Sequence, residues 1–143
     1  MNVLFLAISL ATVPTIAYAD VLDIQIDRKA TLVLDGAQVL VTGTVTCDVS
    51  PDTTFTNSTI FPAVVQLTKN GKIVNVAFAP GTDNFPCSDP TTPSPYALLI
   101  PSAGVTFKPG QAIVGITVQQ VLCNSIECRF SNKNLNQPAV LNP

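Results

Sequence analysis

The chain has 143 residues, of which 47% are hydrophobic and 11% charged, and its formal net charge at pH 7 is −2. It has no histidine and a single glutamate, Glu127, so the side chains that most often move protons in enzymes are scarce. Its basic residues form no run or stripe, which argues against nucleic-acid binding. We therefore expect a protein without enzymatic activity, cofactor or bound metal.

Residues 1–19 have the features of an export signal. An apolar run over residues 3–10 is followed by Ala17-Tyr18-Ala19, with small residues where signal peptidase reads them, and cleavage would precede Asp20. Pro14 interrupts the apolar segment, which is shorter than the roughly 20 residues that a membrane-spanning helix needs. We predict a signal peptide over residues 1–19 and one secreted, extracellular domain over residues 20–143, with no membrane span.

Short extended segments separated by turn residues recur along the rest of the chain. In chain order, strands are predicted over residues 21–27, 30–34, 39–49, 61–67, 73–78, 96–100, 112–122, 127–130 and 138–141. Asp35-Gly36 and Asn70-Gly71 are hairpin turn signals, and the second predicts a type I′ turn, in which both central residues have positive φ. The proline-rich residues 80–95 predict a long surface loop.

Alternation within these strands predicts which side chains face the interior. They are Val39, Val41, Val45, Leu67, Val114, Ile116 and Val118, whereas Thr42 and Thr44 are predicted to lie on an opposite face. No segment has a sustained helical period. The pattern predicts an all-β fold, specifically an immunoglobulin-like or fibronectin-type β-sandwich of about seven to eight strands, with a small barrel as the alternative.

Four cysteines in an exported chain of this size favour two disulfides. Cys123 and Cys128 are separated by four residues at the junction of two predicted strands, so they are predicted to pair across a hairpin, which leaves Cys47 to pair with Cys87. On the loop-entropy model, the long bridge contributes about 4 kcal/mol and the short one about 2 kcal/mol. Zinc binding is the alternative, but the chain has neither CxxC spacing nor histidine.

Three segments carry a family resemblance: Gly43-Thr44-Val45-Thr46-Cys47, Phe107-Lys108-Pro109-Gly110-Gln111-Ala112, and the closing Cys123 and Cys128. With Cys87 between them, these segments resemble a group of small uncharacterised bacterial secreted domains with one immunoglobulin-like domain. In that group a Trp often follows the mid-chain Cys, and this chain has Tyr96 instead. The resemblance implies the fold and assigns no function.

The late Cys-x4-Cys hairpin and the polar, Asn-rich tail after it are also similar to the apoproteins of the neocarzinostatin family, which carry an enediyne chromophore. The first bridge of that family is a short hairpin bridge, whereas Cys47 and Cys87 lie forty positions apart. We therefore do not carry the chromophore pocket over to this chain.

Candidate recognition residues lie on two irregular segments. In residues 80–95 they are Asp83, Phe85 and Asp89, and in the bridged tip they are Asn124, Ile126 and Glu127. Asp83 and Asp89 as a pair could serve a glycosidase or bind Ca²⁺, but both are typical turn residues whose side chains bond nearby backbone. Asn57-Ser58-Thr59 is a glycosylation sequon, which predicts a surface loop in a host that glycosylates.

Two classes of function remain open. The first is a non-enzymatic module for binding, adhesion or surface structure, with an unknown protein or extracellular surface component as partner and its recognition surface on the two irregular segments rather than on the strand faces. The second is a small secreted hydrolase using loop carboxylates. A small-ligand carrier resembling the neocarzinostatin-type apoproteins is a further alternative.

Overall fold

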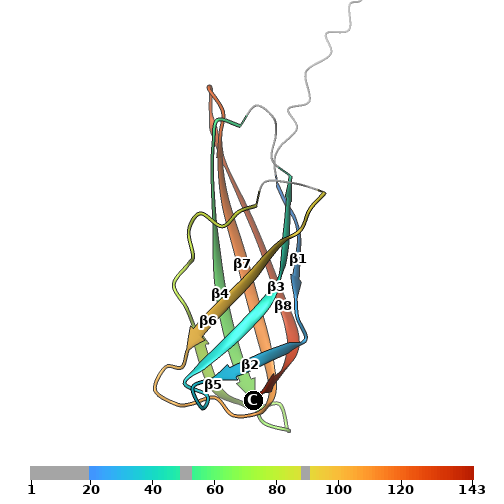
Figure 1. Ribbon diagram of the computed structural model, residues 1–143, viewed down its shortest axis with the longest axis vertical. Coiled ribbons are helices and arrows are strands. Elements are labelled where there is room, and N and C mark those ends of the chain that lie inside the picture. Colours follow the sequence, from blue (N-terminus) through green and yellow to red (C-terminus); the bar gives the residue numbers. More distant parts are fainter. Residues whose placement is uncertain (1–19, 49–52, 88–90) are drawn as a thin grey trace, which may run out of the picture.

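The computed structural model describes residues 20–48, 53–87 and 91–143, and Figure 1 shows them as an elongated all-β molecule. The predicted signal peptide and Asp89 lie outside these residues. The described chain has eight strands: β1 (Asp20–Ile26), β2 (Lys29–Val33), β3 (Gln38–Asp48), β4 (Phe55–Leu67), β5 (Ile73–Phe78), β6 (Ser94–Pro101), β7 (Gly110–Cys123) and β8 (Cys128–Asn142). It contains no helix with the length and apolar character needed to cross a membrane.

The strands form two layers around one core. β1, β3 and β6 make one layer, and the other has the strand order β8, β7, β4, β5. β2 joins the layers because it pairs antiparallel with β3 and parallel with the end of β8. The buried side chains of both layers belong to a single hydrophobic cluster. This arrangement agrees with the predicted all-β class and is consistent with a β-sandwich.

The inner faces of β3 and β7 match the sequence pattern. The side chains of Val39, Val41 and Val45 on β3 are at most 1% exposed. On β7, Val114, Ile116 and Val118 are fully buried. The predicted interior register of these two strands is confirmed.

The predicted register of β4 is wrong. Ile60 and Val64 are fully buried, whereas Leu67 and its odd-numbered neighbours are half-buried on the opposite face. Apolar residues occupy both faces of this strand, so alternation alone does not choose between them. Pairing with β7 decides the choice, because it places Val64 opposite Val114 and Ile60 opposite Val118.

Two polar side chains on the inner faces hold the loop before β7 in place. The Gln66 amide donates to the Lys108 carbonyl (2.6 Å) and accepts from the Lys108 N–H (3.3 Å). Asn75 Nδ2 donates to the Val105 carbonyl (2.7 Å). Phe107, from the motif that carries the family resemblance, is buried at this end of the core, and its N–H donates to the Gly36 carbonyl. The loop before β7 therefore closes the end of the molecule that lies at the bottom of Figure 1.

Two further predictions need correction. The two short segments predicted over residues 127–130 and 138–141 are parts of the single strand β8, which pairs with β7 along its length. The polar stretch between them is extended because its backbone pairs with β7, and it has no hydrophobic pattern that would predict a strand. The hairpin at Asn70-Gly71 forms, but only Gly71 has positive φ (76°). Gly71 N–H donates to the Thr68 carbonyl, so the turn is not of type I′.

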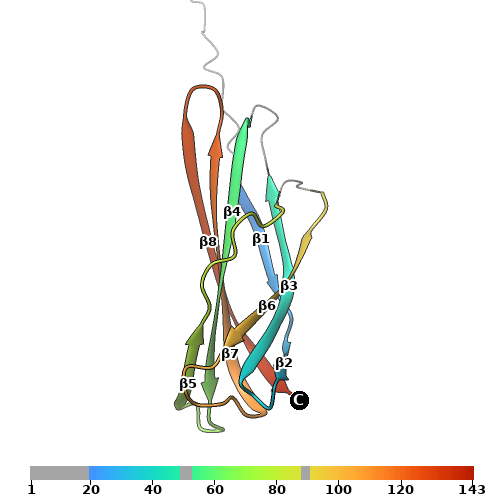
Figure 2. The same cartoon turned by 60° about the vertical axis from the view of Figure 1, so that its left-hand side comes forward.

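The cysteines pair as predicted. Cys47 on β3 bonds to Cys87, with a Cα–Cα distance of 5.4 Å, and Cys123 bonds to Cys128 across the β7–β8 hairpin, with a Cα–Cα distance of 4.0 Å. The first bridge ties the long connection between β5 and β6 to the core. The second staples the tip of the hairpin, which rises beyond the ends of β3 and β6 in Figure 2.

Candidate functional site

The connection after β5 is bound to the edge of β4, and its predicted recognition residues are engaged there. Phe85 is a core residue with 8% exposure, which corrects its assignment to a recognition surface. The Thr59 hydroxyl donates to Asp83 Oδ1 (2.6 Å). The Asn84 N–H donates to Asn57 Oδ1 (3.1 Å). The sequon that begins at Asn57 lies within β4, so it is not on the surface loop that the sequence predicts. Asp83 thus bonds a side chain of β4, 24 residues earlier in the chain, and not the nearby backbone that the turn interpretation expects.

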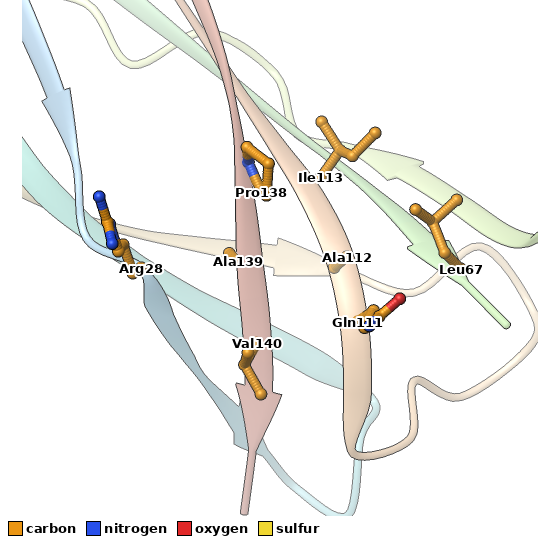
Figure 3. Close-up of a pocket in the computed structure, with 8 residues that line it drawn as sticks. All are labelled: Arg28, Leu67, Gln111, Ala112, Ile113, Pro138, Ala139 and Val140. Atoms are coloured by element: carbon orange, nitrogen blue, oxygen red, sulfur yellow. The ribbon is translucent and has the colours of Figure 1, made fainter. Parts of the chain in front are cut away.

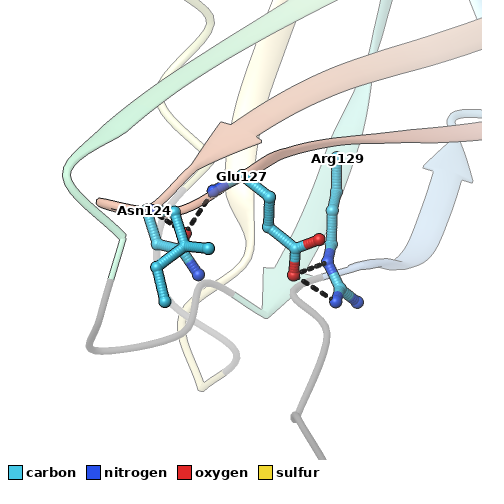
Figure 4. Close-up of polar contacts among 4 residues, drawn as sticks. Asn124, Glu127 and Arg129 are labelled. Atoms are coloured by element: carbon cyan, nitrogen blue, oxygen red, sulfur yellow. Dashed lines mark hydrogen bonds and ion pairs between the residues drawn. The ribbon is translucent and has the colours of Figure 1, made fainter.

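The stapled tip of the β7–β8 hairpin is ordered by its own polar groups. Asn124 Oδ1 accepts hydrogen bonds from the N–H groups of Ile126 and Glu127, each at 2.8 Å. Glu127 pairs with Arg129, whose Nε lies 3.1 Å from Glu127 Oε1 (Figure 4). Ile126 is 90% exposed at the turn. The tip thus presents one apolar side chain on a rigid frame, while its two predicted polar residues are used internally.

A much larger apolar surface lies on the outer face of the layer β8, β7, β4, β5. We call it the outer apolar face and define it by Leu67, Ile73, Val76, Phe78, Ile113 and Val140. Cross-strand pairing makes it continuous: Leu67 lies opposite Ile73, Val65 is opposite both Val76 and Ile113, and Ala63 is opposite Phe78. Phe78 is 75% exposed and Ile73 is 65% exposed. Monomeric proteins rarely expose a continuous patch of this kind, which makes it the candidate interaction surface.

One end of this face is hollowed. Leu67, Ile113, Pro138 and Val140 line an open groove of about 410 Å³ across β4, β7 and β8, as drawn in Figure 3. Ala112 and Ala139 are direct cross-strand partners with buried side chains, so their backbone forms the floor. Arg28, from the bend between β1 and β2, also lines the groove. The lining is mainly apolar and includes one cationic side chain, Arg28.

The chemistry of these surfaces suits binding. In the part of the chain that the structure describes, no three His, Cys, Asp or Glu side chains lie close enough together to hold a metal ion. The acidic side chains at the two predicted sites, Asp83 and Glu127, are each engaged by a neighbouring side chain. Apolar side chains on a rigid sheet, in contrast, can exclude water from a partner surface without moving.

The hydrophobic pattern alone does not predict the outer apolar face, because apolar residues in strands are normally assigned to the interior. The signal was nevertheless present: residues 60–67 are apolar at both odd and even positions, and 73–78 contains four large apolar residues. A strand that is apolar on both faces is covered on both faces or exposes one of them. Comparisons with protein-family models, with curated proteins and with solved structures found no match to this chain.

Proposed function

We propose that this protein is a secreted, non-enzymatic binding module of immunoglobulin type that contacts protein partners through its outer apolar face. The observation that carries the proposal is the continuous exposure of large apolar side chains over four adjacent strands, headed by Phe78 at 75% and Ile73 at 65%. Exposed aromatic and aliphatic side chains are typical anchors of protein interfaces.

The strand connections support the immunoglobulin type. β1 pairs antiparallel with β3, whereas β2 pairs both with β3 and, in parallel, with β8 of the other layer. A split first strand of this kind, followed by a β-sandwich, suits the immunoglobulin-like arrangement that the sequence resemblance implies. Secretion is supported by the two disulfides, which are compatible with an oxidising compartment, and by the predicted signal peptide.

Site-specific photo-crosslinking in the native extracellular medium tests the binding function. A photo-crosslinking amino acid replaces Phe78 in one preparation and Leu99 in another, because Leu99 on β6 is a half-exposed apolar residue of the other layer. We expect a discrete crosslinked protein from position 78, which excess unmodified protein competes away and a Phe78→Asp competitor does not. Equal crosslinking from both positions, or none from position 78, would reject the outer apolar face as the binding surface.

A further inference from the structure

In the described part of the chain, three strands, β1, β5 and β6, each pair with only one other strand. Two of these edges, those of β1 and β6, are protected from further pairing. β6 pairs only with β3, and it carries Pro95 and Pro101, residues that are typical of edges that avoid further pairing. β1 also pairs only with β3, but side chains of β8 reach it: Ser131 Oγ accepts from the Val21 N–H, and Gln137 donates to the Ile26 carbonyl.

The third edge, β5, lacks these protections. Its six residues, Ile73–Phe78, contain neither proline nor a charged side chain. The Ala79 N–H donates to the Pro62 carbonyl, so alternate residues of β5 face β4 with their backbone groups. By this alternation Ala77 and Asn75 bond to β4, whereas the N–H and C=O of Val76 and Phe78 point away from the sheet. In the described part of the chain no hydrogen bond to these outward groups is found.

We propose that β5 pairs antiparallel with β5 of a second copy of this chain, about a two-fold axis at Val76. This inference rests on the proposed function, because the second copy joins at β5, the strand that carries Val76 and Phe78 of the outer apolar face, and extends that face. A two-fold axis at Val76 places Val76 opposite its own copy and Phe78 opposite Val74 of the second copy. The outward backbone groups then pair with one another, and the two sheets become one continuous sheet.

The residues around β5 suit a second copy in this orientation. Lys69 and Lys72 lie before the strand and Asp83 lies beyond it, and all three are exposed. Antiparallel pairing about Val76 brings the basic end of one copy beside the acidic end of the other, and no like charges meet in the strand itself. The apolar side chains of Val76 and Phe78 from both copies then lie on the same face. β5 thus supplies the hydrogen bonds and the apolar contact, and the segments that flank it supply the charge complementarity.

Sedimentation equilibrium of the purified protein over a wide concentration range tests the pairing. Wild-type protein should form a dimer, and Val76→Lys should raise its dissociation constant about tenfold or more, because two like charges meet on the axis. Leu99→Lys is the matched control, since Leu99 is 49% exposed and Val76 is 48% exposed. The control should dimerise as the wild type does, and both variants should unfold at similar denaturant concentrations.

Amide hydrogen exchange identifies the edge itself. The N–H groups of Val76 and Phe78 should exchange more slowly as the protein concentration rises, whereas the rate at Leu99 stays constant. A wild-type monomer at all concentrations, a dimer insensitive to Val76→Lys, or a dimer without slower exchange at Val76 would each overturn the pairing. If a heterologous crosslink from position 78 is obtained with a monomeric protein, the binding function stands and only the second copy is rejected.

Discussion

Tyr96 crosses the inner surface of its layer at the one position that has no side chain. It lies opposite Gly43 on β3, and its hydroxyl donates to the Gln25 carbonyl on β1 (2.8 Å). A Cβ atom at position 43 would overlap both the Tyr96 ring and the Gln25 carbonyl. Gly43 therefore allows one phenol to join three strands, β1, β3 and β6.

Replacing Gly43 by alanine should destabilise the protein by about 1–3 kcal/mol, because the added methyl group forces backbone apart in a packed layer. Chemical denaturation of the purified variant measures the loss. Thr44→Ala on the opposite face of β3 is the control and should change the free energy of unfolding by less than about 0.5 kcal/mol. A harmless Gly43→Ala substitution would contradict the close crossing.

Burial and, secondarily, the nearby Asp27 carboxylate raise the pKa of Tyr96 well above its usual value. The folded protein therefore keeps this proton at pH values where the unfolded chain releases it. The contribution of the protonated Tyr96 hydroxyl to the free energy of unfolding is complete below about pH 10. It is lost as the pH rises further, by roughly 1.4 kcal/mol per pH unit. Urea unfolding from about pH 8 to about pH 11 should show this additional loss in the wild type and not in Tyr96→Phe. Parallel pH curves for the two proteins would contradict it.

At the scale of the elements, β4 shows where a hydrophobic pattern is insufficient. Val64 and Val65 are adjacent and identical, but Val64 is fully buried and Val65 is half-buried on the outer face. Val64→Ala should cost about 1.5–3 kcal/mol, whereas Val65→Ala should cost less than about 1 kcal/mol. Denaturation of the two variants compares them directly. A larger loss at Val65 would restore the register that alternation alone predicts.

The hairpin bridge can be tested without disturbing the core, because Cys128 is exposed and Cys123 is half-buried. Replacing both by serine should lower the free energy of unfolding by about 2 kcal/mol, as the closed loop is short. The exchange rate of amides at the tip, Ile126 included, should rise at the same time. Unchanged stability together with unchanged exchange would mean that Asn124 alone orders the tip.

The sequence predicts what local chemistry determines. Val45 on β3 and Val118 on β7 are flanked only by threonine or glutamine, so the register of these strands follows from the pattern, and the spacing of Cys123 and Cys128 predicts their bridge. The register of β4 does not follow, because Gln66 is polar yet faces inward to bond Lys108. Phe85 likewise lies in a stretch that resembles a surface loop, and only its place beside β4 makes it a core residue. Long-range pairing decides both cases.

At the scale of the whole molecule, the two layers differ in how they meet solvent. The outer face of β3 carries threonines, whereas the outer face of β5, β4 and β7 carries large apolar side chains. An uncovered face of that kind adds nothing to the stability of a monomer, and it exposes the protein to nonspecific association. Its presence on a rigid, disulfide-bonded framework is the basis for assigning it to binding.

Hydroxyl-radical footprinting in the native extracellular medium tests this assignment most directly. Oxidation of Phe78 and Ile113 is compared between purified dilute protein and protein in that medium, with Leu99 as the reference on the other layer. The binding function predicts that Phe78 and Ile113 become protected in the medium while the oxidation of Leu99 is unchanged. Equal oxidation of Phe78 and Ile113 in both conditions would contradict it.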